Sequence, residues 1–366
     1  MSPPRIAVLM DYAAEEWPSM DLCGEMLAEQ LERRSDVAVE RVQPEFRERA
    51  GVLLGERKLG KNADRVFNRY YDYPRALRPV VERCDYFHVV DHSYSQLALT
   101  TPPARTGIYC HDLDTFRCLL EPERDPRPAW FRRLVRSTLR GFTRAARVFF
   151  STHAVRDELI RHALVPPERL VHAPFGVAPE LTPGPADAPA PERRTLLHVG
   201  SSIPRKRVDL LLRIFAELRQ RFTDLRLVKV GAFAPEHEAL IAELELGEAV
   251  ERHERISRQE LAQLYRQATL VLQPSDAEGF GLPLIEGLAC GAVVVASALA
   301  VHEEVGGKAV VYCTPGQVAP WVDACTNLLE VESAAPSRRA RLARAAAYSW
   351  ERHAEVIART YLELPK

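Results

Sequence analysis

Several features that mark other classes of protein are missing from this 366-residue sequence. Its seven cysteines form no CxxC pair and no Cys/His spacing typical of zinc, so we expect reduced thiols and no structural metal. No apolar stretch approaches the ~20 residues needed to span a membrane, and the N-terminus does not read as a signal peptide. A formal net charge of −1 gives no support to nucleic-acid binding. The absences together predict a soluble, cytoplasmic protein.

Short β-branched runs alternate with helical patterns along the whole chain. In the first half such runs occur at 5–11, 37–42, 86–91, 106–111, 147–151 and 169–173. In the second half they occur at 195–200, 225–231, 250–255, 270–273 and 292–297. Nearly continuous apolar strands separated by helices are typical of parallel sheets covered on both faces. The sequence therefore predicts an α/β protein with two Rossmann-like, doubly wound domains facing a cleft.

The two halves are separated by a stretch with no apolar periodicity. Residues 177–193 are rich in proline, alanine and acidic side chains, which is typical of a linker. We expect an N-terminal domain over 1–180, a linker over 181–194 and a C-terminal domain over 195–348.

The most informative stretch, LVLQPSDAEGFGLPLIEGLACGAVVVAS, covers residues 270–297. It predicts a strand, a glycine loop, a helix and a second strand. The backbone N–H groups of Phe280, Gly281 and Leu282 would then lie at the positive end of the helix dipole, which favours a phosphate. Glu286 follows one turn later, where its carboxylate can accept hydrogen bonds from a diol.

This stretch resembles the retaining GT-B glycosyltransferases of family 4, whose signature is two glutamates separated by seven residues. Glu278 and Glu286 have that spacing. The resemblance implies that Glu278 lies near the donor sugar and that Glu286 holds the donor ribose.

Upstream, HVGSSIPRKR at 198–207 is similar to the diphosphate loop of the same family. The resemblance places Gly200 and Ser201 in that loop and gives Arg205 and Lys206 the role of compensating the diphosphate charge. The family often has arginine where this chain has Ser201. Cations at a helix N-terminus oppose its dipole, so the basic pair is expected to need an anion.

Three further segments extend the resemblance. Main-chain groups near Ile256 would meet the nucleobase, and residues 349–364 resemble the helix that crosses back onto the N-terminal domain. YCHDLDTFR at 109–117 places His111 at a strand end, where the family has a histidine near the donor sugar. Asp112 and Asp114 have the spacing of a metal-binding acidic pair in the other main glycosyltransferase fold. Here the context differs, Asp112 is interpreted as a turn residue, and no metal or other cofactor is expected.

Few features of the sequence indicate where the acceptor binds. The loop after the first strand, DYAAEEWPSMD, lacks the glycines common in the family, and Trp17, Ser19 and Met20 could shape the acceptor site or simply pack. The arginine-rich stretch Arg124–Arg147 contains one acidic residue, Asp125, on a helical pattern. It is either a solvated helix face or a surface that docks on anionic lipid.

The resemblance implies transfer of a sugar, with retention, from a UDP- or GDP-linked donor to a hydroxyl acceptor in glycan, polysaccharide or glycolipid synthesis. The protein is expected in the cytoplasm, either free or, if the basic stretch docks on lipid, at the inner face of the membrane with a lipid-linked acceptor. A front-face substitution is expected, with Arg205, Lys206, His111 and Glu278 as catalytic residues. Two alternatives stay open from the residues alone: a nucleotide-sugar epimerase of the same architecture, and a non-catalytic nucleotide-sugar-binding partner in polysaccharide assembly.

Overall fold

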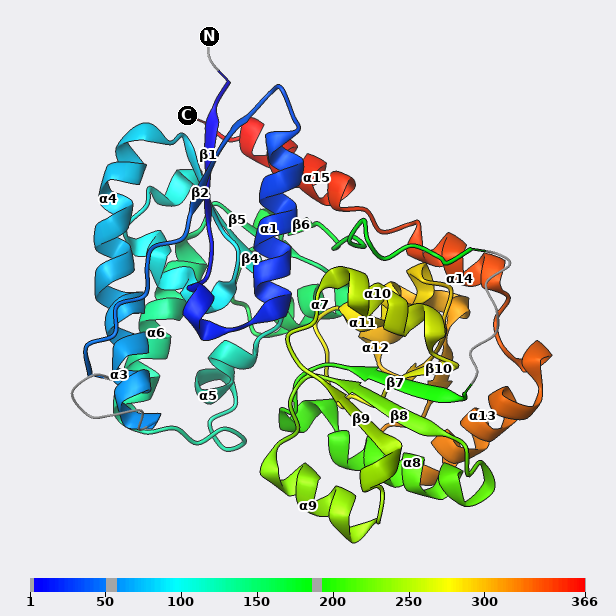
Figure 1. Ribbon diagram of the computed structural model, residues 1–366. Coiled ribbons are helices and arrows are strands. Elements are labelled where there is room, and N and C mark those ends of the chain that lie inside the picture. Colours follow the sequence, from blue (N-terminus) through cyan, green and yellow to red (C-terminus); the bar gives the residue numbers. More distant parts are fainter. Residues whose placement is uncertain (1–2, 51–57, 186–192, 366) are drawn as a thin grey trace. The chain divides into compact units, whose positions relative to one another are not determined.

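The computed structural model describes residues 3–50, 58–185 and 193–365. The chain divides into two compact units, one made of Met1–Gly176 with Trp350–Lys366 and the other of Val177–Ser349. We call them the N-terminal unit and the C-terminal unit. Each contains a parallel six-stranded sheet (Figure 1), which confirms the predicted α/β class with two Rossmann-like domains. The linker expected at 181–194 lies partly outside the described residues.

The sheet of the N-terminal unit has the strand order β2-β1-β3-β4-β5-β6. Strand β1 is second from the edge and is hydrogen-bonded to β2 on one side and to β3 on the other. The strands are β1 (Arg5–Leu9), β2 (Ala38–Val42), β3 (Tyr86–Val89), β4 (Thr106–Cys110), β5 (Arg147–Phe150) and β6 (Leu170–His172).

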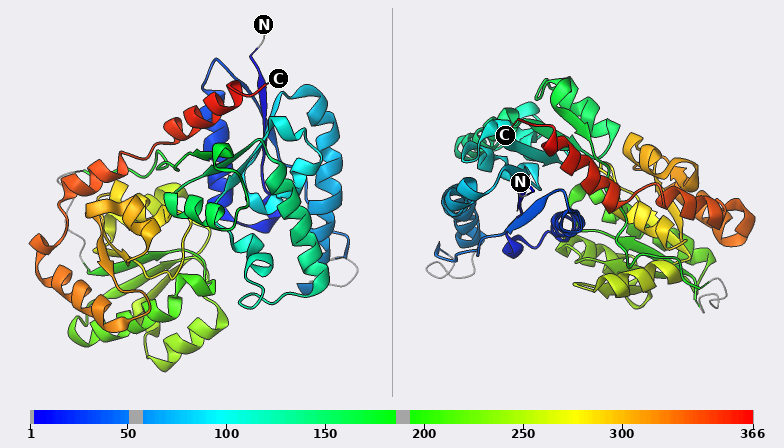
Figure 2. Two further views of the ribbon diagram at one scale, coloured as in Figure 1. Left: turned by 180° about the vertical axis from the view of Figure 1, so that it is seen from behind. Right: turned by 90° about the horizontal axis from the view of Figure 1, so that it is seen from above.

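Helices cover both faces of this sheet (Figures 1 and 2). One face carries α1 (Pro18–Glu32) and α15 (Trp350–Leu362), and Tyr361 of α15 donates a hydrogen bond to the carbonyl oxygen of Phe87 at 3.0 Å. The other face carries a helical layer, of which the sequence analysis identified only α6. Its members are α3 (Lys58–Phe67), the π-turn η2 (Asn68–Asp72), α4 (Tyr73–Arg83), η3 (His92–Leu99), α6 (Ala129–Arg144) and α7 (His153–Arg161).

The C-terminal unit repeats this plan, with strand order β12-β11-β10-β7-β8-β9. Its strands are β7 (Thr195–Val199), β8 (Arg226–Val230), β9 (Val250–His253), β10 (Leu270–Gln273), β11 (Val293–Ser297) and β12 (Val311–Cys313). The helices on one face are α8 (Val208–Arg221), α9 (Pro235–Glu243) and α13 (Val318–Glu330), and those on the other are α10 (Arg258–Gln267), α11 (Leu282–Ala289), α12 (Ala300–Gly306) and α14 (Arg338–Ala345). Strand β12 and helices α12, α13 and α14 were not predicted from the sequence.

Each sheet has one point where the strand order reverses. In the C-terminal unit it lies between β7 and β10, and in the N-terminal unit between β1 and β3. Ligands of doubly wound sheets bind beyond the carboxyl ends of the strands at this point. Among the described helices, none is long and apolar enough to cross a bilayer.

Close packing between α6 and η3 gives a first prediction. A methyl group added at Gly141 of α6 would lie 1.9 Å from the carbonyl oxygen of Ser95, which belongs to the backbone and cannot move away. Gly141→Ala should therefore lower the free energy of unfolding by about 1–3 kcal/mol, despite alanine's better helix propensity. Urea denaturation followed by circular dichroism measures the change.

Gly24 of α1 provides the matched control. A methyl group there would meet only the flexible end of Met10, 2.9 Å away at Cε. Gly24→Ala should change the free energy of unfolding by less than about 1 kcal/mol. Equal destabilisation by the two substitutions would contradict the packing argument.

Candidate functional site

Two loops meet at the strand-order reversal of the C-terminal unit. One follows β7 and contains the 3₁₀ turn Pro204–Lys206, and the other leads from β10 to α11. The backbone N–H of Asp276 donates to the carbonyl oxygen of Arg205 at 2.8 Å, and Arg207 forms an ion pair with the Asp276 carboxylate at 3.0 Å. Arg205 also donates to the carbonyl oxygen of Ala277 at 3.0 Å. The loops therefore form one structure.

A nearly buried ion pair lies at the centre of this structure. Lys206 Nζ is 2.6 Å from Glu278 Oε1, and Arg205 Nη1 is 3.5 Å from Glu278 Oε2. Ser275 Oγ donates to the same carboxylate at 2.7 Å. Burial by itself raises the pKa of Glu278, but the charges of Lys206 and Arg205 hold it down at about 2. The expectation that the basic pair needs an external anion is thus wrong for the protein alone, because Glu278 supplies the negative charge.

A buried lysine supports the first loop from beneath. Lys229 of β8 is fully buried and donates to the carbonyl oxygens of Gly200 at 2.6 Å and Gly231 at 3.0 Å. Burial lowers its pKa to about 8. Gly231 has φ of 104°, and a Cβ there would lie 2.4 Å from the Gly200 oxygen, so glycine is required for this close approach. Ser201, next to Gly200, is exposed.

The second loop ends at the N-terminus of α11. Gly281 is the residue before the helix and has a left-handed conformation with φ of 83°. Leu282 begins the helix and Pro283 follows in its first turn, where the missing proline N–H costs nothing. Phe280 is buried against Tyr348, with ring centroids 5.5 Å apart. This packing fixes the position of the helix start, where the positive end of the helix dipole favours a negative charge.

Glu286 lies one turn into α11 and is buried. Its Oε2 accepts a hydrogen bond from Tyr265 of α10 at 2.8 Å. Burial raises the pKa of Glu286 to about 7, although the tyrosine contact acts in the opposite direction. The two signature glutamates therefore differ: Glu278 is a firmly ionised carboxylate, whereas Glu286 titrates near neutral pH. Ile256 is half-buried in the loop between β9 and α10.

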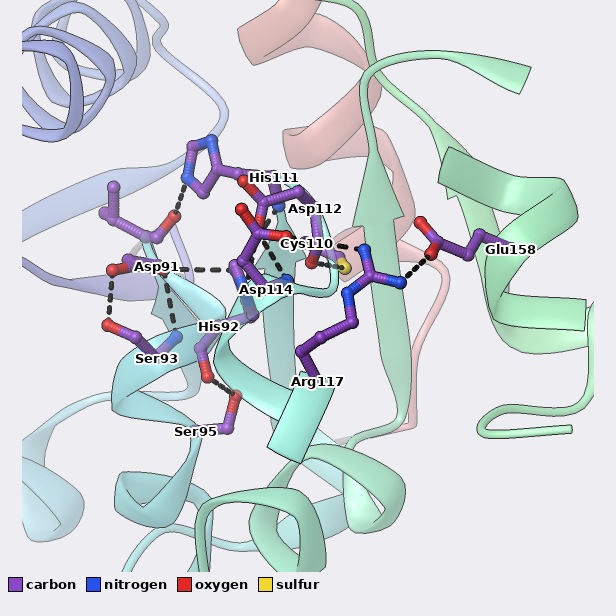
Figure 3. Close-up of polar contacts among 11 residues, drawn as sticks. Asp91, His92, Ser93, Ser95, Cys110, His111, Asp112, Asp114, Arg117 and Glu158 are labelled. Carbon is purple, nitrogen blue, oxygen red and sulfur yellow. Dashed lines mark hydrogen bonds and ion pairs between the residues drawn. The ribbon is translucent and has the colours of Figure 1, made fainter. Parts of the chain in front are cut away.

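Histidine and aspartate side chains gather at the corresponding edge of the N-terminal unit (Figure 3). His92 lies between Asp91 and Asp112, with its Nδ1 3.1 Å from Asp91 and its Nε2 3.5 Å from Asp112. Burial by itself would lower the pKa of His92, but the bond to Asp91 raises it. His111 is buried, and its Nε2 donates to the carbonyl oxygen of Val90 at 2.9 Å. Burial also lowers its pKa, so His111 is a neutral side chain.

The other N-terminal candidates lie on neighbouring segments. Asp112 accepts the backbone N–H of Asp114 at 3.0 Å, which fits the turn interpretation. Trp17 precedes α1 and lies under the guanidinium of Arg69, 5.1 Å from the ring centre. Ser19, which is exposed, and Met20, which is half-buried, belong to the first turn of α1.

Several polar residues at these edges were not predicted. They are Lys229, Tyr265, His302 and, in the N-terminal unit, Asp11, whose two carboxylate oxygens are buried without a hydrogen-bond partner. Lys229 could have been predicted as a site residue, because it lies inside the apolar run RLVKV and an unpaired charge in a buried strand is costly. The pairing of Tyr265 with Glu286 left no signal in the sequence.

Two family profiles match the chain. "Glycosyltransferase Family 4" covers residues 25–181 and "Glycosyl transferases group 1" covers residues 186–348. A D-inositol 3-phosphate glycosyltransferase of Kineococcus radiotolerans is 32% identical over 248 residues, which are 59% of this chain and 57% of that protein. The chain spans about half the length of the curated relatives that it matches.

Solved structures agree in fold at low identity. A sucrose-phosphate synthase from Thermosynechococcus elongatus superposes with a TM-score of 0.78 at 19% identity, covering 98% of each chain. Anabaena HepE in complex with UDP and glucose superposes with a TM-score of 0.74 at 16% identity, covering 99% of this chain and 100% of that one. With both halves matched in sequence and the whole chain in fold, this protein belongs to the retaining GT-B glycosyltransferases of family 4.

Proposed function

We propose that this protein transfers a sugar from a UDP- or GDP-linked donor to a hydroxyl acceptor and that its C-terminal unit holds the donor. The observation that carries the proposal is the arrangement at the strand-order reversal, where Lys206, Arg205 and the start of α11 surround Glu278. The complex of HepE with UDP-glucose supports a uridine donor as one candidate.

The charges of the site suit a diphosphate flanked by a sugar and a ribose. Lys206 and Arg205 together exceed the charge of Glu278 by one, and the dipole of α11 adds to the positive potential. Glu278 would then accept hydrogen bonds from sugar hydroxyls, and Glu286 from the ribose. Gly200 and Ser201 would lie along the diphosphate, with Ile256 near the base.

Retention, which family membership implies, makes the reaction a front-face substitution. The bond between the anomeric carbon and the diphosphate oxygen breaks while the acceptor oxygen bonds to the same face of that carbon. The acceptor proton passes to the departing phosphate oxygen. Lys206, Arg205 and the α11 dipole stabilise the negative charge that develops on this leaving group. His111, neutral and fixed by its bond to the Val90 oxygen, would orient the donor sugar.

An acceptor at a membrane is supported by the exposed face of α6. Trp130 is 62% exposed there, and Arg133, Arg136, Arg140 and Arg144 are exposed along the same helix. A basic face with an exposed aromatic residue is typical of helices that lie on anionic lipid. On the basis of this surface, the proposed protein is cytoplasmic, lies at the inner face of the membrane and acts on a lipid-linked acceptor.

The first functional prediction is that the protein binds a nucleoside diphosphate without a metal ion. UDP or GDP should raise the melting temperature in the presence of EDTA, because the positive charge comes from the protein. At a nucleotide concentration of 100 times the Kd, the free energy of unfolding should rise by about 2.7 kcal/mol. Lys206→Gln should weaken nucleotide binding by about 10-fold or more, since it removes a charge-assisted contact. Lys308→Gln, at an exposed lysine of the same unit, should have no effect. Absence of any thermal shift with UDP, GDP and ADP would refute the donor site.

The second prediction separates the two glutamates. Glu286→Gln should weaken binding of the nucleotide by about 1–2 kcal/mol, because the hydrogen bonds from ribose lose their charged acceptor. Glu278→Gln should leave UDP or GDP binding unchanged or tighter, since Lys206 and Arg205 lose their internal partner, while transfer is lost. Isothermal titration and a transfer assay measure both effects. Equal loss of nucleotide affinity in both variants would contradict this division.

Stability gives Glu286 an independent readout. Its pKa of about 7 in the folded protein lies above its ordinary value of 4.5, so the folded state binds more protons and stability falls as pH rises through this range. The cost of the ionised form is about 3 kcal/mol. Glu286→Gln should therefore melt higher than wild type at pH 8.5 and at nearly the same temperature at pH 5.

The fourth prediction tests the membrane surface. Replacing Arg133, Arg136 and Arg140 with glutamine should reduce co-sedimentation with anionic vesicles, since each arginine near the surface contributes about 1 kcal/mol. High salt should reproduce the loss, and nucleotide affinity should not change. The control removes the same charge elsewhere on the N-terminal unit, at the exposed Arg161, Arg352 and Arg359. If the wild type never binds such vesicles, the acceptor is to be sought in solution.

A further inference from the structure

A histidine that belongs to neither signature motif faces the start of α11. His302 of α12 is fully buried, and its Nδ1 lies 2.9 Å from the carbonyl oxygen of Ser297. A carbonyl can only accept, so Nδ1 carries the hydrogen. Its Nε2 is buried with no hydrogen-bond partner. A Cβ built on Gly281 would lie 3.4 Å from this nitrogen, so Nε2 is aimed at the loop that ends at α11.

The other loop has a histidine in the same arrangement. His198 of β7 is buried, and its Nδ1 donates to the carbonyl oxygen of Leu272 at 2.9 Å. Its Nε2 also has no partner, and a Cβ on Gly200 would lie 3.6 Å from it. Buried polar atoms without partners are uncommon and costly, so two of them at the two glycines of one site call for an explanation.

The charges around the two imidazoles differ. Burial lowers the pKa of both, but Glu278 acts in the opposite direction on His302, against a smaller effect of Lys206. His198 is affected first by burial and then by the charge of Lys229, which holds its pKa at about 3. Glu278 therefore favours a proton on His302, whereas the charge of Lys229 opposes one on His198.

The remaining groups packed against α12 do not alter this balance. Arg344 of α14 donates to the carbonyl oxygen of Val305, at the far end of the helix. The hydroxyl of Tyr312 donates to the backbone oxygen of His302 and not to its ring. On α11, Glu286 is bonded to Tyr265.

We propose that His302 takes up a proton when the nucleoside diphosphate binds and donates its Nε2–H to a phosphate oxygen. The inference rests on the proposed donor site. An anion at the start of α11 would lie beside Gly281, and an opposite charge within about 4–6 Å favours the charged imidazole by about 1–3 pKa units. The new N–H then has an acceptor, and the unpartnered nitrogen becomes a ligand contact.

Calorimetric titration with UDP and GDP tests the proposal. Measured near pH 7 in buffers of different ionisation enthalpy, binding to wild type should take up more protons than binding to His302→Gln, by a sizeable fraction of one proton. The variant also corrects for the proton that the diphosphate itself binds. The affinity of wild type relative to the variant should rise as the pH falls, by about tenfold per unit at most. Binding with equal proton uptake in both proteins would overturn the inference and leave the donor site intact, whereas no binding at all would refute the donor site.

A second measurement needs no stable variant at position 302. In wild-type protein labelled with ¹³C-histidine, the ring signal of His302 should titrate at higher pH when nucleotide is bound, by about one unit or more. The His198 signal serves as an internal control and should stay neutral in both states. A His302 signal that remains neutral with nucleotide bound would mean that Nε2 accepts a hydrogen bond, for example from a sugar hydroxyl, and would overturn the proposal.

Discussion

The ion pair between Lys206 and Glu278 is the interaction on which the two loops at the strand-order reversal of the C-terminal unit depend. Its two residues belong to loops that leave different strands, β7 and β10, so the pair fixes the position of each loop relative to the other. Neither charge could be buried alone, because an isolated ion inside a protein costs several kcal/mol. The bonds of Arg205 and Asp276 reinforce the same connection. A preformed loop pair would let the proposed site hold a diphosphate without reorganisation at each turnover.

Such an internal ion pair also has a disadvantage for ligand binding. Glu278 already neutralises part of the charge that a diphosphate would meet at the proposed site, so the cations would be held in place at the expense of affinity for the bare nucleotide. In the proposed function, the compensation would come when a sugar is attached, because its hydroxyl groups would give Glu278 other partners. The same carboxylate can therefore favour the intact donor over the product nucleotide, which would help the product to leave.

Both sheets place ionisable groups at the strand-order reversal, but with opposite character. In the C-terminal unit the edge is cationic, with Lys206 and Lys229 around the two glycines. In the N-terminal unit the corresponding edge carries Asp11, Asp91 and His92. Burial, followed by the charge of Asp91, raises the pKa of Asp11 well above its usual range. An acidic edge with a proton to share suits the binding of hydroxyl groups, whereas a cationic edge suits phosphate.

Those features of the fold and of the site that depend on local chemistry could be predicted from the sequence. Apolar strands alternating with helices predicted the α/β class, and the Gly281–Pro283 pattern predicted where α11 begins, because glycine and proline act on their own backbone. The resemblance around Glu278 and Glu286 predicted the family. Only the tertiary structure decided that Lys206 pairs with Glu278, that Tyr265 covers Glu286 and that His302 faces Gly281. These contacts join residues from separate loops and helices, and they exist only because β7, β10 and β11 lie side by side in the folded sheet. Strand order is a property of the whole domain, and no short stretch of sequence encodes it.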